Sequence, residues 1–599
     1  MLLPTTLYTC LTSCARGLRR GALAVVVLPA LALGADEGLK LVIDGGNNTL
    51  KNNVRHYLGD LDRLPCDARE LHVHNALSRA DPAISEALRA LGYYHGSWKI
   101  DTSRTPARNG NGKNGECWQV SVALTPGDPT LLTDIHAEIR GPGGDDPDFS
   151  SVLDDLPLRK DRKLNHGQYD QAKRMIQQRA AALGYFASEY RESVLRVNRE
   201  THSATAVLIF DSGPRYRFGA INYPDTVLKQ SFLERYQTFA SGDPYDVNKV
   251  IGFQNNLINS QYFDIVSVNQ REPDPDTATV DIDLELAVKS RYESTFGTGF
   301  STNLGPKASY VLKNRRYNSD GDTYQISTQW SPVESNVGFQ YEQPGADPLR
   351  EKTLWSAGWR QEDSDSVDST AFLGEVSRVT MLDNGWMLTR SLSVLNEDFR
   401  VADSEGSTTS FLVYPGVQLA RSRANDARYP TRGWRVTAGV KGASEDLLSD
   451  TSFVQTTLDG KFILPLGGGR LISRGGFGAT WVDAFATLPA SLRFFAGGDS
   501  SVRGFDYQSL GPRNSAGEVT GGKNLITGSV EYDYLVWGDY GVAVFYDTGS
   551  AFDTRQFKLY ESAGFGLRWL SPIGPIRVDF AFPLADGGFR FHLSMGPDL

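Results

Sequence analysis

The chain has 599 residues, more than one hydrophobic core can organise, so we expect two or more structural units. It contains 60 glycines, 25 tyrosines and 29 phenylalanines but only 5 methionines, a bias that favours β-structure with tight turns over helix bundles. The formal net charge of -10 argues against nucleic acid as a partner. No later stretch holds 18 consecutive apolar residues, so the sequence predicts no transmembrane helix.

The N-terminus predicts an export signal over residues 1–35. Three arginines precede the apolar run 22–33, which suits a signal sequence and is too short to span a bilayer. The run ends in the small residues Gly34 and Ala35, where we expect cleavage.

Two cysteines, Cys66 and Cys117, remain after this expected cleavage. An even number in an exported chain favours one disulfide over free thiols. The segment "HVH" could place His72 and His74 on one face of a surface strand, but no third ligand is apparent, so we expect no metal site.

A similar phrase occurs three times before residue 290: "LRALGYYHGSWKI", "AAALGYFASEY" and "LINSQYFDIVSV". Each phrase closes a run with helical spacing of apolar residues, and an alternating run typical of a strand follows each. We therefore expect three α+β units, each a small sheet covered by helix, at 36–125, 126–213 and 214–289. Exposed sheet edges in such units are docking sites for extended peptides.

From 290 to 599 the helical period is replaced by alternating runs separated by turn-forming residues. In "PIRVDFAFP" four apolar side chains share one face, and Arg577, Asp579 and Ala581 share the other. A soluble sandwich and a transmembrane barrel both produce this alternation. The signal sequence, the aromatic-rich apolar face and a final run close to the C-terminus favour an antiparallel barrel of about 16 strands.

Four motifs in this half resemble the BamA/TamA superfamily of outer-membrane assembly and secretion barrels. They are "YPTRGWRV" (429–436), "VRGF" (502–505), "FYDTGSAF" (545–552) and "GPIRVDFAFPL" (574–584). The resemblance covers nearly the whole mature chain and implies three periplasmic POTRA units followed by a transmembrane barrel. Three such units and the ending "FHLSMGPDL" are most similar to the TamA subgroup.

The resemblance implies that the loop carrying Val502, Arg503, Gly504 and Phe505 folds back into the barrel lumen. In this family the motif arginine pairs with acidic residues on the strand wall. The matching partner of Arg503 is Asp547 of "FYDTG", and Glu531 is a second candidate. A guanidinium and a carboxylate can form a two-pronged pair, so the expected role is to fix the loop.

The resemblance also implies a weak seam between the first strand, near 290–302, and the last, near 587–595. Residues expected at this seam are Phe296, Gly297, Gly299, Gly587, Gly588, Phe591 and Leu593. The glycines would weaken strand pairing, or they would simply ease barrel curvature, and both interpretations remain open.

The implied function is an outer-membrane assembly factor that inserts autotransporters and other barrels through this seam. Its implied partners are unfolded outer-membrane proteins, outer-membrane lipid and an inner-membrane-anchored, TamB-like periplasmic protein. Alternatives are a two-partner secretion pore for one soluble protein and a passive channel. No G-x-x-x-x-G-K-[ST], H-E-x-x-H or G-x-S-x-G motif is present, so we expect neither an enzyme nor a cofactor.

Overall fold

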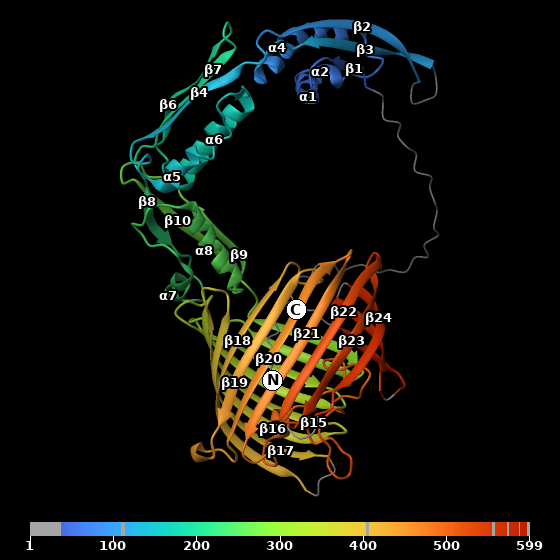
Figure 1. Cartoon of the computed structure of the whole chain (residues 1–599). Coiled ribbons are helices and arrows are strands. Elements are labelled where there is room, and N and C mark those ends of the chain that lie inside the picture. The colour runs from blue at the N-terminus through green and yellow to red at the C-terminus, as the bar shows by residue number, and fades with distance from the viewer. Residues whose placement is uncertain are drawn as a thin grey trace, which may run out of the picture. The chain divides into compact units, whose positions relative to one another are not determined.

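The computed structural model describes residues 38–108, 114–402, 406–553, 557–571, 574–585 and 587–595 (Figure 1). It divides into two compact units, one formed by Met1–Ala180 with Ser188–Gly213 and the other by Ala181–Ala187 with Pro214–Leu599. The expected signal sequence lies outside the described residues.

The first sheet belongs to the first unit and has three strands in the order β1-β3-β2. Its elements are β1 (Lys40–Asp44), α1 (Asn48–Tyr57), α2 (Gly59–Asp62), α3 (Glu70–Leu77), α4 (Ala80–Ala90), β2 (Ser97–Arg108) and β3 (Asn114–Thr125). Helix α1 begins where the Asn47 side chain accepts a hydrogen bond from the Leu50 N–H, at 2.9 Å. The apolar faces of α1 and α4 bury Leu50, Val54 and Ile84 against the sheet.

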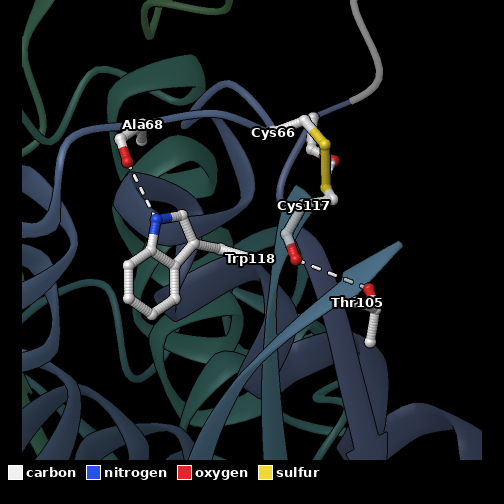
Figure 2. Close-up of a disulfide and its surroundings, with 6 residues drawn as sticks. Cys66, Ala68, Thr105, Cys117 and Trp118 are labelled. Atoms are coloured by element: carbon white, nitrogen blue, oxygen red, sulfur yellow. Dashed lines mark hydrogen bonds between the residues drawn. A yellow bond between two sulfur atoms is a disulfide. The ribbon is translucent and has the colours of Figure 1, made fainter. Parts of the chain in front are cut away.

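A disulfide joins Cys66 to Cys117, near the start of the central strand β3 of this sheet, with the two Cα atoms 4.6 Å apart (Figure 2). The bond connects the segment after α2 to strand β3. Trp118 lies beside it, and its Nε1–H donates to the Ala68 carbonyl at 2.8 Å. The Trp118 backbone N–H donates to the Cys66 carbonyl at 3.0 Å, so covalent and hydrogen bonds hold the same two segments together.

The segment "HVH" lies in helix α3, not in the surface strand that the sequence predicted. Side chains two positions apart on a helix point in different directions, so His72 and His74 share no face. Val73 between them is buried and both histidines are exposed. Among the described residues, no group of three His, Cys, Asp or Glu side chains could hold a metal ion.

The second sheet has four strands in the order β5-β4-β7-β6. Its elements are β4 (Leu131–Arg140), α5 (Pro147–Ser150), η1 (Ser151–Leu153), β5 (Arg162–Lys163), α6 (His166–Ala182), β6 (Glu189–Asn198) and β7 (Ser203–Asp211). Helix α6 buries Ala172, Ile176 and Ala180, the apolar stripe expected from the sequence.

The third sheet, in the second unit, has three strands in the order β8-β10-β9. Its elements are β8 (Arg217–Asn222), α7 (Gln230–Leu233), η2 (Glu234–Tyr236), α8 (Val247–Asn259), β9 (Phe263–Gln270) and β10 (Thr279–Val288). The three sheets share one arrangement, in which the last strand in the chain (β3, β7 or β10) lies between two earlier strands. It runs parallel to the first of these (β1, β4 or β8) and antiparallel to the second (β2, β6 or β9). The helices of the described residues include none that is long and apolar enough to cross a membrane.

From Tyr292 onward the described residues form one antiparallel sheet of 16 strands, which curls into a barrel (Figure 1). The strands are β11 (Tyr292–Ser301), β12 (Gly305–Asn314), β13 (Thr323–Trp330), β14 (Glu334–Pro344), β15 (Glu351–Asp363), β16 (Val367–Met381), β17 (Met387–Val401), β18 (Thr408–Ala424), β19 (Gly433–Ala443), β20 (Phe453–Leu466), β21 (Gly469–Val482), β22 (Asn524–Trp537), β23 (Tyr540–Phe552), β24 (Tyr560–Ser571), β25 (Gly574–Pro583) and β26 (Arg590–Met595). Short helices η3 (Glu445–Leu447) and η4 (Ala490–Leu492) lie in its loops. This confirms the expected fold class.

Burial in the barrel is inverted relative to a soluble protein. On β23, Val544 and Tyr546 are exposed on the outer face, whereas Ala543, Phe545 and Asp547 are buried inside. An apolar outer face with a polar lumen is the pattern of a barrel surrounded by lipid. The alternation that sequence reasoning left ambiguous therefore belongs to a transmembrane barrel.

The barrel is nearly closed. In the described part of the chain, β11 pairs only with β12 and β26 only with β25, so the first and last strands share no hydrogen-bond ladder. Strand β26 starts at Arg590, three residues later than expected. Gly587 and Gly588 adopt left-handed backbone, with φ of 69° and 83°, in the turn before it. Their expected placement in the seam strand was wrong, because this conformation belongs to turns.

Candidate functional site in the barrel lumen

The loop between β21 and β22, residues 483–523, carries the "VRGF" motif against the inner wall of the barrel. Two glycines allow this close approach. Gly504 has φ of +94°, and a Cβ there would lie 3.3–3.4 Å from Pro583 and Ser562. Gly498 has φ of +97°, and its Cβ would lie 2.8 Å from the Asn303 side chain. The flexible backbone around the motif thus permits turns that bring Arg503 to the wall.

Arg503 and Asp547 form a two-pronged ion pair. The Arg503 Nε donates to Asp547 Oδ2 at 2.7 Å and Nη2 donates to Oδ1 at 2.9 Å. The Arg503 backbone N–H adds a third bond to Oδ2 at 3.1 Å. Asp547 is 0% exposed and Arg503 4% exposed, so the pair fixes both the position and the orientation of the loop.

The same guanidinium reaches two further carboxylates. Its Nη1 donates to Glu531 Oε2 at 2.8 Å and to Asp579 Oδ2 at 2.9 Å. Arg568 links these acids from their other side, with Nη2 2.7 Å from Glu531 Oε1 and Nη1 2.5 Å from Asp579 Oδ1. Arg474 lies 3.6 Å from Asp547, so three arginines face three carboxylates. The buried charges are therefore balanced, which burial requires.

The strands place these groups by register and alternation. Glu531 is on β22, Asp547 on β23, Arg568 on β24 and Asp579 on β25, all on the inner face. The Arg503 guanidinium carbon also lies 3.4 Å from the centre of the Phe545 ring, a cation–π contact from the same wall. Four adjacent strands thus contribute to holding one loop residue.

The other motif residues pack around this cluster. Val502 is fully buried in an apolar cluster with Ala496, Leu510 and Ala551. The Phe505 ring meets Tyr560 of β24 edge to face, with centroids 5.5 Å apart. The apolar residues of the motif therefore support the same placement of the loop as its charge.

Further contacts hold the rest of the loop. The Ser491 backbone N–H donates to Glu397 of β17 at 3.1 Å. The Gln508 side-chain amide donates to Glu362 of β15 at 2.8 Å. These contacts hold two further points of the loop, at Ser491 and Gln508, against the inner wall of the barrel.

The residues expected at the seam lie on its two strands, apart from the two glycines already described. Phe296 is 80% exposed on the outer face of β11, and Phe591 is exposed on β26. Gly297 and Gly299 lie opposite Ser309 and Lys307 of β12. Leu593 lies opposite Val578 of β25 and is half-buried.

Sequence reasoning missed Asp579, Arg568 and His592 as members of the lumen cluster. The alternation in "PIRVDFAFP" already placed Asp579 on the polar face, and that was the available signal. Asp547 on β23 was assigned from its motif. His592 lies opposite Asp579 in the structure, but this pairing register cannot be read from the sequence of one strand alone.

Comparison with known proteins assigns this architecture to a family. A family model described as the Omp85 superfamily domain matches residues 270–598, more than half of the chain. A second model, described as POTRA domain TamA domain 1, matches residues 40–126.

Curated proteins with similar sequences include outer membrane protein assembly factors BamA. The protein from Nitratidesulfovibrio vulgaris is 23% identical over 401 residues, which cover 61% of this chain and 49% of the relative. The protein from Neorickettsia risticii is 25% identical over 421 residues, covering 63% and 54%. The chain thus spans about half the length of the curated relatives it matches.

The fold is also similar to a crystal structure of BamA from Haemophilus ducreyi lacking POTRA domains 1–3. The TM-score is 0.67 at 17% identity, and the match covers 77% of this chain and 99% of that one. At this identity the likeness concerns the fold. With the family match, the inverted burial and the lumen loop together, the chain belongs to the Omp85 superfamily, as an outer-membrane β-barrel with periplasmic POTRA domains.

Proposed function

We propose that the chain is an outer-membrane assembly factor that inserts and translocates autotransporters and other β-barrel proteins through the seam between β11 and β26. One observation carries the proposal: within the described residues, the facing edges of these two strands have no ladder partner. Each unpaired backbone group in hydrocarbon costs several kcal/mol. An incoming strand that pairs with such an edge is therefore stabilised as it enters the membrane.

The composition of the seam supports this role. Strand β11 carries Gly297 and Gly299, which pack no side chain against a partner. The Arg503 cluster, in contrast, is held by β22 to β25 and does not depend on β11. The seam can separate in this arrangement while the loop stays anchored to the wall.

The POTRA domains supply binding edges for the partners we propose, namely unfolded outer-membrane proteins and an inner-membrane-anchored, TamB-like periplasmic protein. In the third sheet β9 is an edge strand, and its Ile265 is 61% exposed. In the second sheet β6 is an edge strand, with Val194 exposed. An extended peptide that adds to such an edge gains main-chain hydrogen bonds and a place for alternate side chains.

The proposal is tested with the purified full chain in liposomes, to which a urea-denatured autotransporter barrel is added. We expect the client to fold into the bilayer faster than in protein-free liposomes, measured by its heat-modifiable gel mobility. A heat-denatured sample of the chain is the control for non-specific holding of the client.

The outcome that would contradict the proposal is equal client folding with and without the chain. If the chain instead transfers a soluble client protein across the liposome membrane and inserts no barrel, the chain is better described as a two-partner secretion pore.

A further inference from the structure

The two edges of the seam lack a ladder, but a polar contact spans them through the lumen loop. Asp499 of the loop accepts a hydrogen bond from Thr302 Oγ1 at 3.1 Å, and Thr302 lies in the turn directly after β11. The same Asp499 oxygen contacts Nδ1 of His592, which lies on β26. One carboxylate oxygen therefore bridges the first and last strands of the barrel.

The hydrogen bonds of His592 determine its tautomer. The Gly504 backbone N–H donates to Nε2 at 2.9 Å, so this nitrogen accepts and carries no proton. The ring proton therefore lies on Nδ1 and is donated to Asp499. His592 is 3% exposed at its side chain and Asp499 is 16% exposed, so little water competes for this bond.

Asn303 strengthens the link on the β11 side. In the amide orientation that satisfies both of its polar atoms, its nitrogen donates to Asp499 Oδ1 at 3.3 Å and its oxygen accepts from the Asp499 N–H at 3.2 Å. The close approach of Gly498 to this side chain allows the contact. The turn after β11 thus offers two side chains to one loop residue.

We propose that Asp499 is a positioning residue that latches the seam, holding Thr302 and His592 together until a client strand displaces the last strand. The inference rests on the assembly function proposed above and adds a second, separable role to the loop. Arg503 anchors the loop to β22 through β25. Asp499 uses that anchored loop to hold the two edges that must part.

A second contact between loop and last strand provides a matched control. Asp506 pairs with Arg590 of β26, but this pair is open to solvent, with side chains 58% and 42% exposed. The Asp506 side chain thus contacts the β26 side of the seam through Arg590. Loss of Asp506 therefore removes an acid from the same loop without removing the bridge to β11.

The test measures seam separation directly in the full chain, reconstituted in lipid nanodiscs. Nitroxide labels are attached to the variants Phe300→Cys on β11 and Phe565→Cys on β24, both at outward-facing positions. Cys10 and Cys14, which lie in the expected signal sequence, are replaced by serine. The Cys66–Cys117 disulfide does not react with the label. Double electron–electron resonance then gives the fraction of molecules with a long label separation.

We expect this fraction to rise about tenfold in Thr302→Val, the change that follows from losing one hydrogen bond to a charged group. It should rise at least as much in Asp499→Ala, which also loses the side-chain contacts with His592 and Asn303. Thr302→Val keeps the side-chain shape and lies in a turn, so it leaves the barrel folded, which heat-modifiable mobility verifies. Asp506→Ala should match the unsubstituted chain.

Unchanged distances in both Asp499→Ala and Thr302→Val would overturn the latch, as would an equal rise in Asp506→Ala. The measurement needs no client, so its result is independent of the liposome assay. If the unsubstituted chain inserts no client, the assembly function fails while the distances still decide whether Asp499 holds the seam. If it inserts clients and the distances do not change, only the latch fails.

Discussion

Arg503 is the residue on which the lumen loop depends. Its guanidinium bonds to Asp547, Glu531 and Asp579, whose own charges need a cation at this depth. Removing one member of such a buried set leaves its partners uncompensated, and this costs more than the net value of the pair. The anchor is therefore sensitive to both the charge and the shape of residue 503.

Substitutions of Arg503 separate these two contributions. Arg503→Ala should lower the free energy of unfolding by up to about 3–5 kcal/mol, because Asp547 loses its two-pronged partner and Glu531 and Asp579 each lose one of their two arginine donors. Arg503→Lys should lower it less, because the charge remains but the two-pronged pair cannot form. The midpoint of heat-modifiable mobility for the purified barrel measures both changes.

Arg513→Ala is the control, because the Arg513 guanidinium donates to the backbone carbonyls of Gly517 and Ser509 in its own loop. It should leave the midpoint unchanged. If Arg503→Ala behaves like this control, the loop is not anchored through the charge cluster.

The sequence predicts the ion pair of Arg503 with Asp547 more readily than the wider network of charged side chains around it. The motif and the alternation on β23 point to Asp547 as the partner of Arg503. Asp579 and Arg568 could not be placed beside it, because contact between them depends on the register of three neighbouring strands. His592 is missed for the same reason.

Elements with a clear period are predicted well, and short or irregular ones are not. Helix α6 and strand β23 have long apolar patterns that match their structure. The segment "HVH" fails because three residues cannot distinguish a strand from a helix. The start of β26 fails because Gly587 and Gly588 form a turn where the sequence suggests continued strand.

The disulfide of the first sheet gives a prediction at the scale of elements. Cys66 and Cys117 are 51 residues apart, and reducing such a bond widens the unfolded ensemble. Cys66→Ser with Cys117→Ser should lower the local free energy of unfolding by about 2–5 kcal/mol. Hydrogen exchange of β3 amides in the full chain measures this loss.

Strands β8 to β10 of the second unit serve as the internal control and should keep their exchange rates. Unchanged exchange in β3 would mean that the hydrogen bonds around Trp118 hold the two segments without the covalent bond.

His166, the first residue of α6, predicts that the local stability of this helix depends on pH. Burial lowers the pKa of His166 below its ordinary value of 6.5, and the nearby Asp170 carboxylate opposes the shift in part. The ring bonds to the Tyr94 hydroxyl at 2.8 Å, and Arg199 lies over the Tyr94 ring. Protonation is thus easier in the unfolded chain than in the folded one.

Because the unfolded state binds more protons, local stability should fall as the pH drops below about 6.5 and level off below the folded pKa. Protection factors of α6 amides in the full chain, compared at pH 7.5 and 5.5, should show the loss. In His166→Gln the difference between the two pH values should shrink. If the protection factors of His166→Gln differ between the two pH values as much as those of the unsubstituted chain, groups other than His166 cause the pH dependence.

For the whole molecule, the class and the approximate number of strands follow from length, alternation and composition. Length, alternation and composition do not predict whether the first and last strands pair with each other. That pairing depends on where the two strands end and on how their edges meet. The structure shows that, among the described residues, the free edge of β11 has no ladder partner. We propose that this edge receives client strands.

The most direct test places a photo-crosslinking amino acid at Phe296 of β11 in living cells and identifies what it traps. We expect an adduct with a newly exported barrel or autotransporter, and a weaker adduct in Arg503→Ala. The same probe at Phe411, outward-facing on β18 in the middle of the sheet, should trap no client. Trapping only the chain's own last strand, or only a soluble exported protein, would show that the seam does not receive client strands.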